Sequence, residues 1–256
     1  MVYARRGSTG RLTAALMAAT LLTACANSQA RSSQPPHHPS SVAATSAAPA
    51  PTQASQPLLA PAPLFDPAID LRAGAVAVPL ELQLPSLRLT APVLGVGLNS
   101  KNVMDTPMGS AKDPVWQKVF WYRGSGIPGD ATTATIAGHV DDVIGRPAIF
   151  ARLKDLRVGD TVTVRDTRTG LAIDFVVTQT VTYTLQQTVD PAVLAQIYGS
   201  GPVTGQGPQP SPDGLAHLTL ITCTGNWVNR IGTFDHRLAV YAVALPSAIP
   251  HVRSRF

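Results

Sequence analysis

Residues 218–223 read LTLITC, and residues 236–241, which follow after a short polar loop, read HRLAVY. Aliphatic and β-branched residues dominate both stretches and predict two neighbouring strands. Because side chains alternate along a strand, we expect Cys223 and Arg237 to lie on faces that meet at one end of the sheet. A nearby cation favours the thiolate, and the fixed fork of guanidinium donors suits a developing oxyanion. The two stretches therefore predict a sheet end suited to nucleophilic chemistry.

A proton carrier for this chemistry is expected at His139, which follows the small and apolar run at 134–138. Imidazole is the side chain that most often serves as general acid or base. Asp141 and Asp142 either orient the imidazole or form a solvated turn. With ordinary pKa values of about 8.5 for Cys223 and 6.5 for His139, the thiolate–imidazolium form is a small minority at every pH. If the two groups couple, this ion pair is instead the main form at pH values between their two macroscopic pKa values.

Two other histidines, His217 and His236, compete for this role. His217 lies six residues from Cys223, about 20 Å along a straight strand at ~3.3 Å per residue, which is too far for contact. His236 faces away from Arg237 along the strand, and we expect it to meet Asp235 or solvent. His139 is therefore preferred as the acid.

The first 25 residues have the features of an export signal. Arg5, Arg6 and Arg11 precede an apolar run at 12–24, which is shorter than the ~20 residues needed to span a bilayer. The sequence LTAC that ends at Cys25 resembles the bacterial lipobox. We expect the mature chain to begin at Cys25, to be lipidated there, and to be held at the outer face of the plasma membrane. Cleavage at a nearby Ala-x-Ala-like site, with release of the protein, is the alternative.

Residues 26–75 are rich in Pro, Ala and Ser and contain few large apolar side chains. Such a segment buries too little surface to offset the entropy of ordering and is predicted to be a disordered tether. At up to ~3 Å per residue it would reach well over 50 Å. His37 and His38 are interpreted as solvated linker residues.

Residues 76–247 are predicted to form one folded domain, and 248–256 a short basic tail. Between positions 78 and 246 the chain carries 13 Lys and Arg and 13 Asp and Glu, so the domain is neutral. The positive net charge of the chain therefore comes from its ends, and nucleic-acid binding has little support.

Cys223 has no evident disulfide partner once Cys25 is assigned to the processing site. A lone thiol in an exported protein is either buried and inert or reactive by purpose. The histidine and the arginine favour the reactive interpretation. Zinc bound by Cys223, His139 and His236 is a further alternative, although no Cys-x-x-Cys or His-x-x-x-His pair supports it.

The rest of the domain reads as β-structure with two short helices. Strand-like runs separated by Gly, Pro, Asp or Asn occur at 80–89, 91–98, 132–137, 161–165, 172–183, 215–222 and 236–244. A hairpin loop is expected at 166–170 and helices at 147–156 and 191–198, the second capped by Asp190 and ended by Gly199. This spacing predicts an all-β fold, a closed barrel with short helical insertions.

The ordered motifs of the domain resemble the sortase family, most closely the actinobacterial class F group, with classes E and D next. The resemblance rests on GIPGD at 126–130, IAGH at 136–139, FARL at 150–153, VGDTV at 158–162, TLITC at 219–223 and Arg237, together with WYRG at 121–124 and GHVD at 138–141. It covers nearly the whole of 78–246.

The resemblance implies an eight-stranded sortase barrel with Cys223, His139 and Arg237 as catalytic residues. It also implies cleavage of an LPxTG-like sorting peptide between Thr and Gly through a Cys223 thioester, followed by transfer to an amine of a cell-wall precursor or another protein. Thr222 and Thr224 are expected to contact the peptide. Neither a metal nor another cofactor is expected, and the protein is expected to be a monomer.

Three features bear on the choice of substrate and on rival functions. The stretches 199–214 and 224–227 differ from the family pattern where substrate selection is expected, and DPVW at 113–116 resembles a lid motif of pilus-building sortases, but with different spacing and with no role assigned. An L,D-transpeptidase is disfavoured because its Ser-His-Gly-Cys block is absent. A non-catalytic lipoprotein with the same barrel, or a hydrolytic peptidase, remains as an alternative.

Overall fold

The computed structural model describes residues 70–244 and 251–252. The predictions for the signal peptide, for lipidation at Cys25, for the tether up to position 69 and for most of the basic tail lie outside the described residues. Within the described part, no helix is both long and apolar enough to cross a bilayer.

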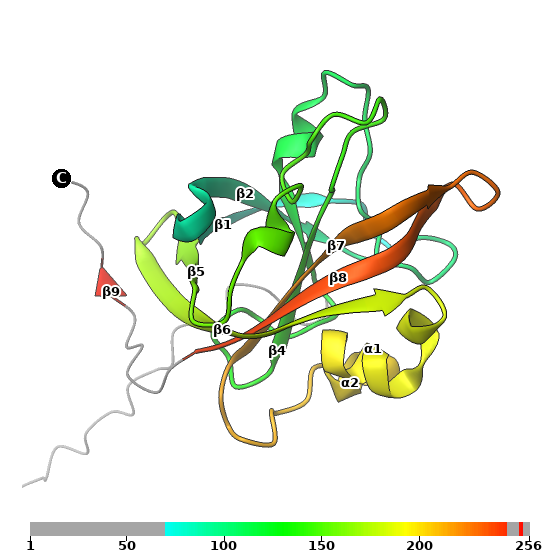
Figure 1. Cartoon of the computed structure of the whole chain (residues 1–256). Coiled ribbons are helices and arrows are strands. Elements are labelled where there is room, and N and C mark those ends of the chain that lie inside the picture. Colours follow the sequence, from blue (N-terminus) through cyan, green and yellow to red (C-terminus); the bar gives the residue numbers. More distant parts are fainter. Residues whose placement is uncertain (1–69, 245–250, 253–256) are drawn as a thin grey trace, which may run out of the picture. The chain divides into compact units, whose positions relative to one another are not determined.

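Eight strands close into a barrel in the order β5-β1-β2-β3-β4-β7-β8-β6, with β6 pairing back onto β5 (Figure 1). The strands are β1 (Val76–Leu84), β2 (Leu89–Val96), β3 (Val119–Tyr122), β4 (Thr133–Gly138), β5 (Thr161–Asp166), β6 (Leu171–Thr184), β7 (His217–Val228) and β8 (Thr233–Ala244). A two-residue strand, β9 (His251–Val252), adds to β6. The predicted all-β closed barrel is confirmed.

Two hydrophobic clusters lie on opposite faces of the barrel wall. One fills the interior with side chains such as Trp121, Phe175 and Leu220. The other lies outside and includes Ile221 of β7 together with Ile197 of α1 (Pro191–Tyr198). Residues 218–222 of β7 are buried on both faces of the wall, and two of them, Thr219 and Thr222, are buried polar residues.

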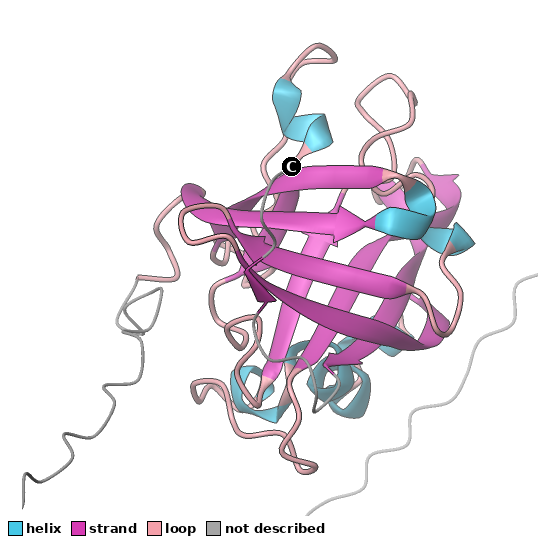
Figure 2. Cartoon of the chain, turned by 90° about the vertical axis from the view of Figure 1, so that its left-hand side faces the viewer, coloured by secondary structure: helices cyan, strands magenta, loops and turns pink. Residues whose placement is uncertain are grey.

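The helical turns lie outside the strands, at the periphery of the barrel (Figure 2). They are η1 (Pro85–Leu87), η2 (Pro114–Gln117), η3 (Leu153–Asp155), η4 (Gln187–Val189), α1 and α2 (Ser200–Val203). Helix α1 begins and ends as predicted: the Asp190 carboxylate accepts from the backbone of Ala192 and Val193, and Gly199 ends it at φ 84°.

The predicted helix at 147–156 is wrong, since only η3 forms there. Backbone N–H groups of this segment bond to distant carbonyls instead: Ile149 to Trp116 and Phe150 to His139, both at 2.9 Å. The Phe150 ring is 1% exposed and belongs to the interior cluster. Tertiary bonding has therefore replaced the local helical ladder.

The strands differ from the prediction in three places. The run at 80–89 is divided by η1, and Arg88 adopts a left-handed φ of 54° before β2 begins. Strand β3 was not predicted, although its four residues are all buried, and it pairs in parallel with β2. The hairpin of β7 and β8 extends beyond the predicted strands, to Val228 and from Thr233.

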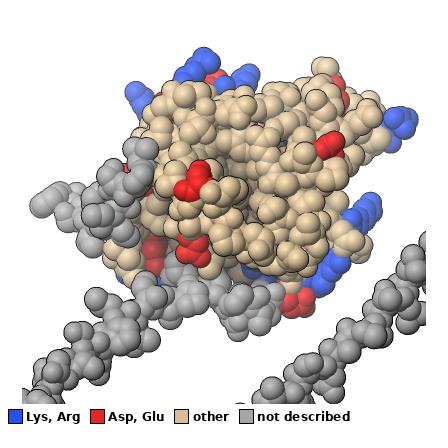
Figure 3. Space-filling view, turned by 90° about the horizontal axis from the view of Figure 1, so that it is seen from below, with Lys and Arg blue, Asp and Glu red and all other residues tan. Residues whose placement is uncertain are grey.

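Charged side chains on the face seen in Figure 3 are scattered, with Lys and Arg at the edges and a few Asp and Glu between them. No broad basic patch gathers among the described residues on this face. The view agrees with the balanced charge that the sequence gives the domain.

Gly138 generates a prediction about folding, because a Cβ at this position would lie 2.5 Å from the ring of Phe150. The Phe150 ring is enclosed and cannot withdraw. We expect Gly138→Ala to lower the free energy of unfolding by about 1–3 kcal/mol, measured by urea denaturation. Gly74→Ala, where a Cβ meets nothing within 4 Å, serves as the control. Equal midpoints for the two variants would contradict the close approach.

Candidate active site

Three adjacent strands bring Cys223, His139 and Arg237 together. In the parallel pair β4 and β7, Ala137 lies opposite Ile221, so that His139, which follows β4, lies beside Cys223. In the antiparallel pair β7 and β8, Cys223 lies opposite Arg237. All three side chains line one cleft of about 700 Å³. The structure thus places the three predicted residues in a single site.

The histidine is held in one orientation by its surroundings. Its Nε2 lies 2.8 Å from the carbonyl oxygen of Pro107. A carbonyl only accepts, so Nε2 carries the proton in the neutral ring and Nδ1 is the nitrogen left to exchange a proton. The ring packs against Trp116 at 4.8 Å and edge-on against Phe120 at 5.2 Å between centroids.

The DPVW stretch supports this histidine from behind. Asp113 caps η2 by accepting from the backbone of Val115, and the Trp116 indole donates to the Ser110 carbonyl at 2.7 Å. Trp116 lines the cleft, and only 4% of this residue is exposed. The segment therefore acts as a buried support for His139 in this structure.

Burial opposes charge on both His139 and Cys223. It lowers the pKa of His139, against the smaller opposing effects of the Pro107 carbonyl and Asp141. It raises the pKa of the Cys223 thiol, while Arg237 and the Thr233 hydroxyl lower it and Asp141 raises it further. Both directions disfavour the ion pair, so the neutral thiol and imidazole predominate near neutral pH and the thiolate–imidazolium form is the minority.

Arg237 is fixed by the hairpin from which it projects. One guanidinium nitrogen donates to the carbonyls of Phe234 and His236 at 3.0 and 2.9 Å, and the other donates to the Thr233 hydroxyl at 3.1 Å. No carboxylate of the described residues pairs with it. A rigid cation without a counter-ion thus faces the cleft.

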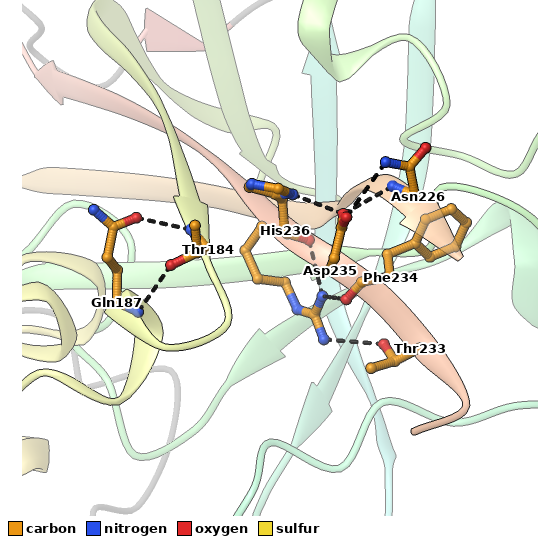
Figure 4. Close-up of polar contacts among 8 residues, drawn as sticks. Thr184, Gln187, Asn226, Thr233, Phe234, Asp235 and His236 are labelled. Atoms are coloured by element: carbon orange, nitrogen blue, oxygen red, sulfur yellow. Dashed lines mark hydrogen bonds and ion pairs between the residues drawn. The ribbon is translucent and has the colours of Figure 1, made fainter. Parts of the chain in front are cut away.

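The competing histidines have other partners. His236 Nδ1 lies 2.6 Å from Asp235, whose carboxylate also accepts from the backbone of Asn226 at 2.8 Å (Figure 4). His217 lies 3.0 Å from Asp213. Neither histidine lines the cleft. The expectation that His236 meets Asp235 is confirmed, and no group of three or more metal-ligating side chains occurs within the described ranges.

The threonines beside the cysteine differ in position. Thr222 lines the cleft and donates its hydroxyl to the Gly138 carbonyl at 2.8 Å, which ties β7 to the residue before His139. Thr224 lies opposite His236 in the hairpin and is absent from the cleft wall.

The two aspartates after His139 both line the cleft but differ in their contacts. Asp142 is buried and accepts from the backbone of Ile144 and Arg146, which makes it a cap for its own loop. Asp141 lines the cleft, and its charge acts on both His139 and Cys223.

A second groove of about 510 Å³ adjoins the cleft and shares five lining residues with it: Val103, Met104, Tyr198, Ile221 and Arg237. Its walls come from α1, η4 and the 98–104 segment, and most of its lining is aliphatic. Tyr198 packs edge-on against Tyr122 at 5.6 Å, and burial raises its pKa to about 12. Sequence reasoning missed this tyrosine and the Pro107 carbonyl, because the last residue of a short helix and a backbone group carry no motif.

Comparison with known proteins supplies the family. Residues 82–245 match the family model described as the sortase domain. Among solved structures, the chain is similar to a lid mutant of sortase A from Corynebacterium diphtheriae, with 20% identity over 68% of this chain and 73% of that chain and a TM-score of 0.43. Sortase C-1 from Actinomyces oris has 21% identity over 65% and 73% of the chains, with a TM-score of 0.43.

A third similar structure is sortase C1 from Streptococcus agalactiae, with 23% identity over 65% of this chain and 66% of that chain and a TM-score of 0.42. The comparison with curated proteins found no match.

The electrostatics of the cleft predict opposite effects of two substitutions on the Cys223 pKa. Arg237→Gln removes a cation and should raise it, whereas Asp141→Asn removes a repelling charge and should lower it. The pKa is the midpoint of the alkylation rate by iodoacetamide against pH, in chains whose Cys25 is replaced by Ser. Without either substitution, we expect the Cys223 pKa to lie above the ordinary cysteine value of about 8.5. Shifts of the same sign in both variants would contradict the assignment.

Proposed function

The chain belongs to the sortase family of cysteine transpeptidases, and from this premise we propose that Cys223, His139 and Arg237 cleave an LPxTG-like sorting peptide between Thr and Gly and transfer its acyl part to an amine. The observation that carries the proposal is the convergence of a free thiol, an oriented imidazole and a cation without a counter-ion in one cleft. Each group suits one part of acyl transfer.

In the first half-reaction, the Cys223 thiolate attacks the carbonyl carbon of the threonine. Donors of Arg237 face the oxygen on which negative charge develops. The imidazolium of His139 gives its proton to the departing glycine nitrogen, and the C–N bond breaks. A thioester on Cys223 and a neutral His139 remain.

In the second half-reaction, a neutral amine attacks the thioester carbon and passes a proton to His139. The C–S bond breaks, an amide forms, and the thiolate and imidazolium are restored. An acceptor that arrives as an ammonium must first lose one proton to water. Water in place of the amine gives hydrolysis, which is the competing outcome.

The cleft and the second groove suggest where each part of the substrates binds. The aliphatic groove beside α1 suits the apolar residues that precede the scissile bond. The cleft beyond His139, with Asp141 in its wall, is then left for the leaving peptide and the incoming amine. Arg237 and Tyr198 lie at the junction, where the scissile carbonyl would be placed.

The proposed setting is the outer face of the plasma membrane, with the chain anchored through lipidated Cys25 and located beside the cell wall. The leader-like sequence and the lipobox-like LTAC support it. The partners are the sorting peptides of exported proteins and an amine from a cell-wall precursor or another protein. The alternatives are a hydrolytic peptidase of the same fold and a non-catalytic lipoprotein.

The proposal predicts amine-dependent cleavage that needs both Cys223 and His139. Incubation with a panel of LPxTG-like peptides, with and without triglycine, is followed by liquid chromatography of the products. Cys223→Ala should abolish cleavage without altering the melting temperature, and His139→Ala should reduce it by about 10²–10⁴-fold.

His236→Ala is the matched control and should retain activity, because this side chain lies outside the cleft. Full cleavage by Cys223→Ala would overturn the proposal. Cleavage whose products never include the triglycine adduct would leave the hydrolytic peptidase as the function.

A further inference from the structure

Large apolar side chains stand exposed around the mouth of the cleft. Of the ten exposed large hydrophobic residues in the described part, four line the cleft, and two more, Ile144 and Ile231, are next in sequence to residues that line it. We define the cleft rim as these six residues, Val103, Met108, Val143, Ile144, Trp227 and Ile231. Met108 is 70%, Ile144 65% and Trp227 55% exposed. Exposed apolar side chains in such a cluster mark an interaction site, unlike the same residues scattered singly.

The cleft rim is built from three segments that are distant in sequence. Val103 and Met108 come from the β2–β3 connection, Val143 from the loop after β4, and Trp227 from the end of β7. These four side chains line the same cleft, so the three segments surround one opening. Figure 1 shows the β2–β3 connection, the loop after β4 and the β7–β8 turn projecting beyond the barrel wall.

The charged residues beside the cleft rim that are classed as exposed are all cationic. In the segments 98–113, 139–147 and 225–233, the exposed charged residues are Lys101, Lys112, Arg146 and Arg230. Each lies within four residues of a rim side chain.

The acidic residues of the same segments are less exposed than these cations. Asp142 is buried, and Asp105, Asp113 and Asp141 are only partly exposed. Asp113 caps η2, and Asp142 pairs with Arg146, which still keeps 54% of its side chain exposed. The outermost layer of the rim is therefore apolar and cationic.

We propose that the cleft rim docks on the surface of an anionic lipid bilayer. An indole at the tip of a hairpin suits the interface between head groups and acyl chains, and long cationic side chains reach past apolar ones to lipid phosphates. Each nearby Lys or Arg adds attraction to an anionic leaflet. The lower exposure of the aspartates reduces the repulsion that such a surface would impose.

Docking in this manner turns the open side of the catalytic cleft toward the bilayer. The inference does not depend on the proposed acyl transfer or on lipidation of Cys25, since it concerns only the surface around the cleft.

The test uses the chain from residue 70 onward, which contains the whole barrel and both core clusters, so that the N-terminal segment cannot supply the binding. The probe is a vesicle of brominated phosphatidylcholine with or without phosphatidylglycerol. Subtracting the signal of Trp227→Phe isolates the fluorescence of Trp227 from that of the buried Trp116 and Trp121. We expect quenching of Trp227 by the anionic vesicles, weakened at high salt.

Substitution of the rim cations supplies the matched comparison. The pair Lys101→Gln and Arg230→Gln should weaken binding to anionic vesicles roughly 30-fold. The pair Lys154→Gln and Arg157→Gln removes the same charge from exposed positions outside the cleft and should leave binding unchanged.

Three results would overturn the proposal. They are absence of Trp227 quenching on anionic vesicles, equal binding by the two double variants, and shielding of Trp227 at rising protein concentration without vesicles. The last result would mean that a second copy of the chain covers the rim. Because no peptide is present, failure here leaves the cleavage experiment unaffected.

Discussion

The register of β4 and β8 on either side of β7 is the constraint on which the site depends. Ala137 opposite Ile221 and Cys223 opposite Arg237 place a histidine, a thiol and a guanidinium side by side. A slip of β7 by one residue would turn the thiol to the other face of the wall. Two contacts fix the register of β4 and β7 next to His139 and Cys223. The Thr222 hydroxyl donates to the Gly138 carbonyl, and Gly138 packs closely against the Phe150 ring.

The same packing that orients the reacting groups also works against their charges. Burial raises the thiol pKa and lowers the imidazole pKa, and Arg237 offsets only part of the cost to the thiolate. The guanidinium is held by two carbonyls and a hydroxyl, so it is positioned before any substrate arrives. The cleft therefore holds a mostly neutral pair beside a preorganised cation, and the reactive charge state is a small fraction of the molecules.

Much of this arrangement was predictable, because it follows from strand alternation and local caps. The closed barrel, helix α1 with its Asp190 cap, and the meeting of Cys223 with Arg237 all rest on such local rules. The helix at 147–156 was wrong, because backbone bonds to Trp116 and His139 are tertiary. Strand β3 is too short to show a period, and the carbonyl of Pro107 that orients His139 has no side-chain signature.

The central claim is that this register creates a nucleophile at Cys223, and trapping the acyl-enzyme tests it most directly. The protein is mixed with an LPxTG-like peptide, quenched in acid and analysed by intact and peptide mass spectrometry. The account predicts a covalent adduct with the mass of the peptide's N-terminal part through threonine, located on Cys223 and discharged by added amine. Absence of any adduct during measurable cleavage, or an adduct on another residue, would contradict it.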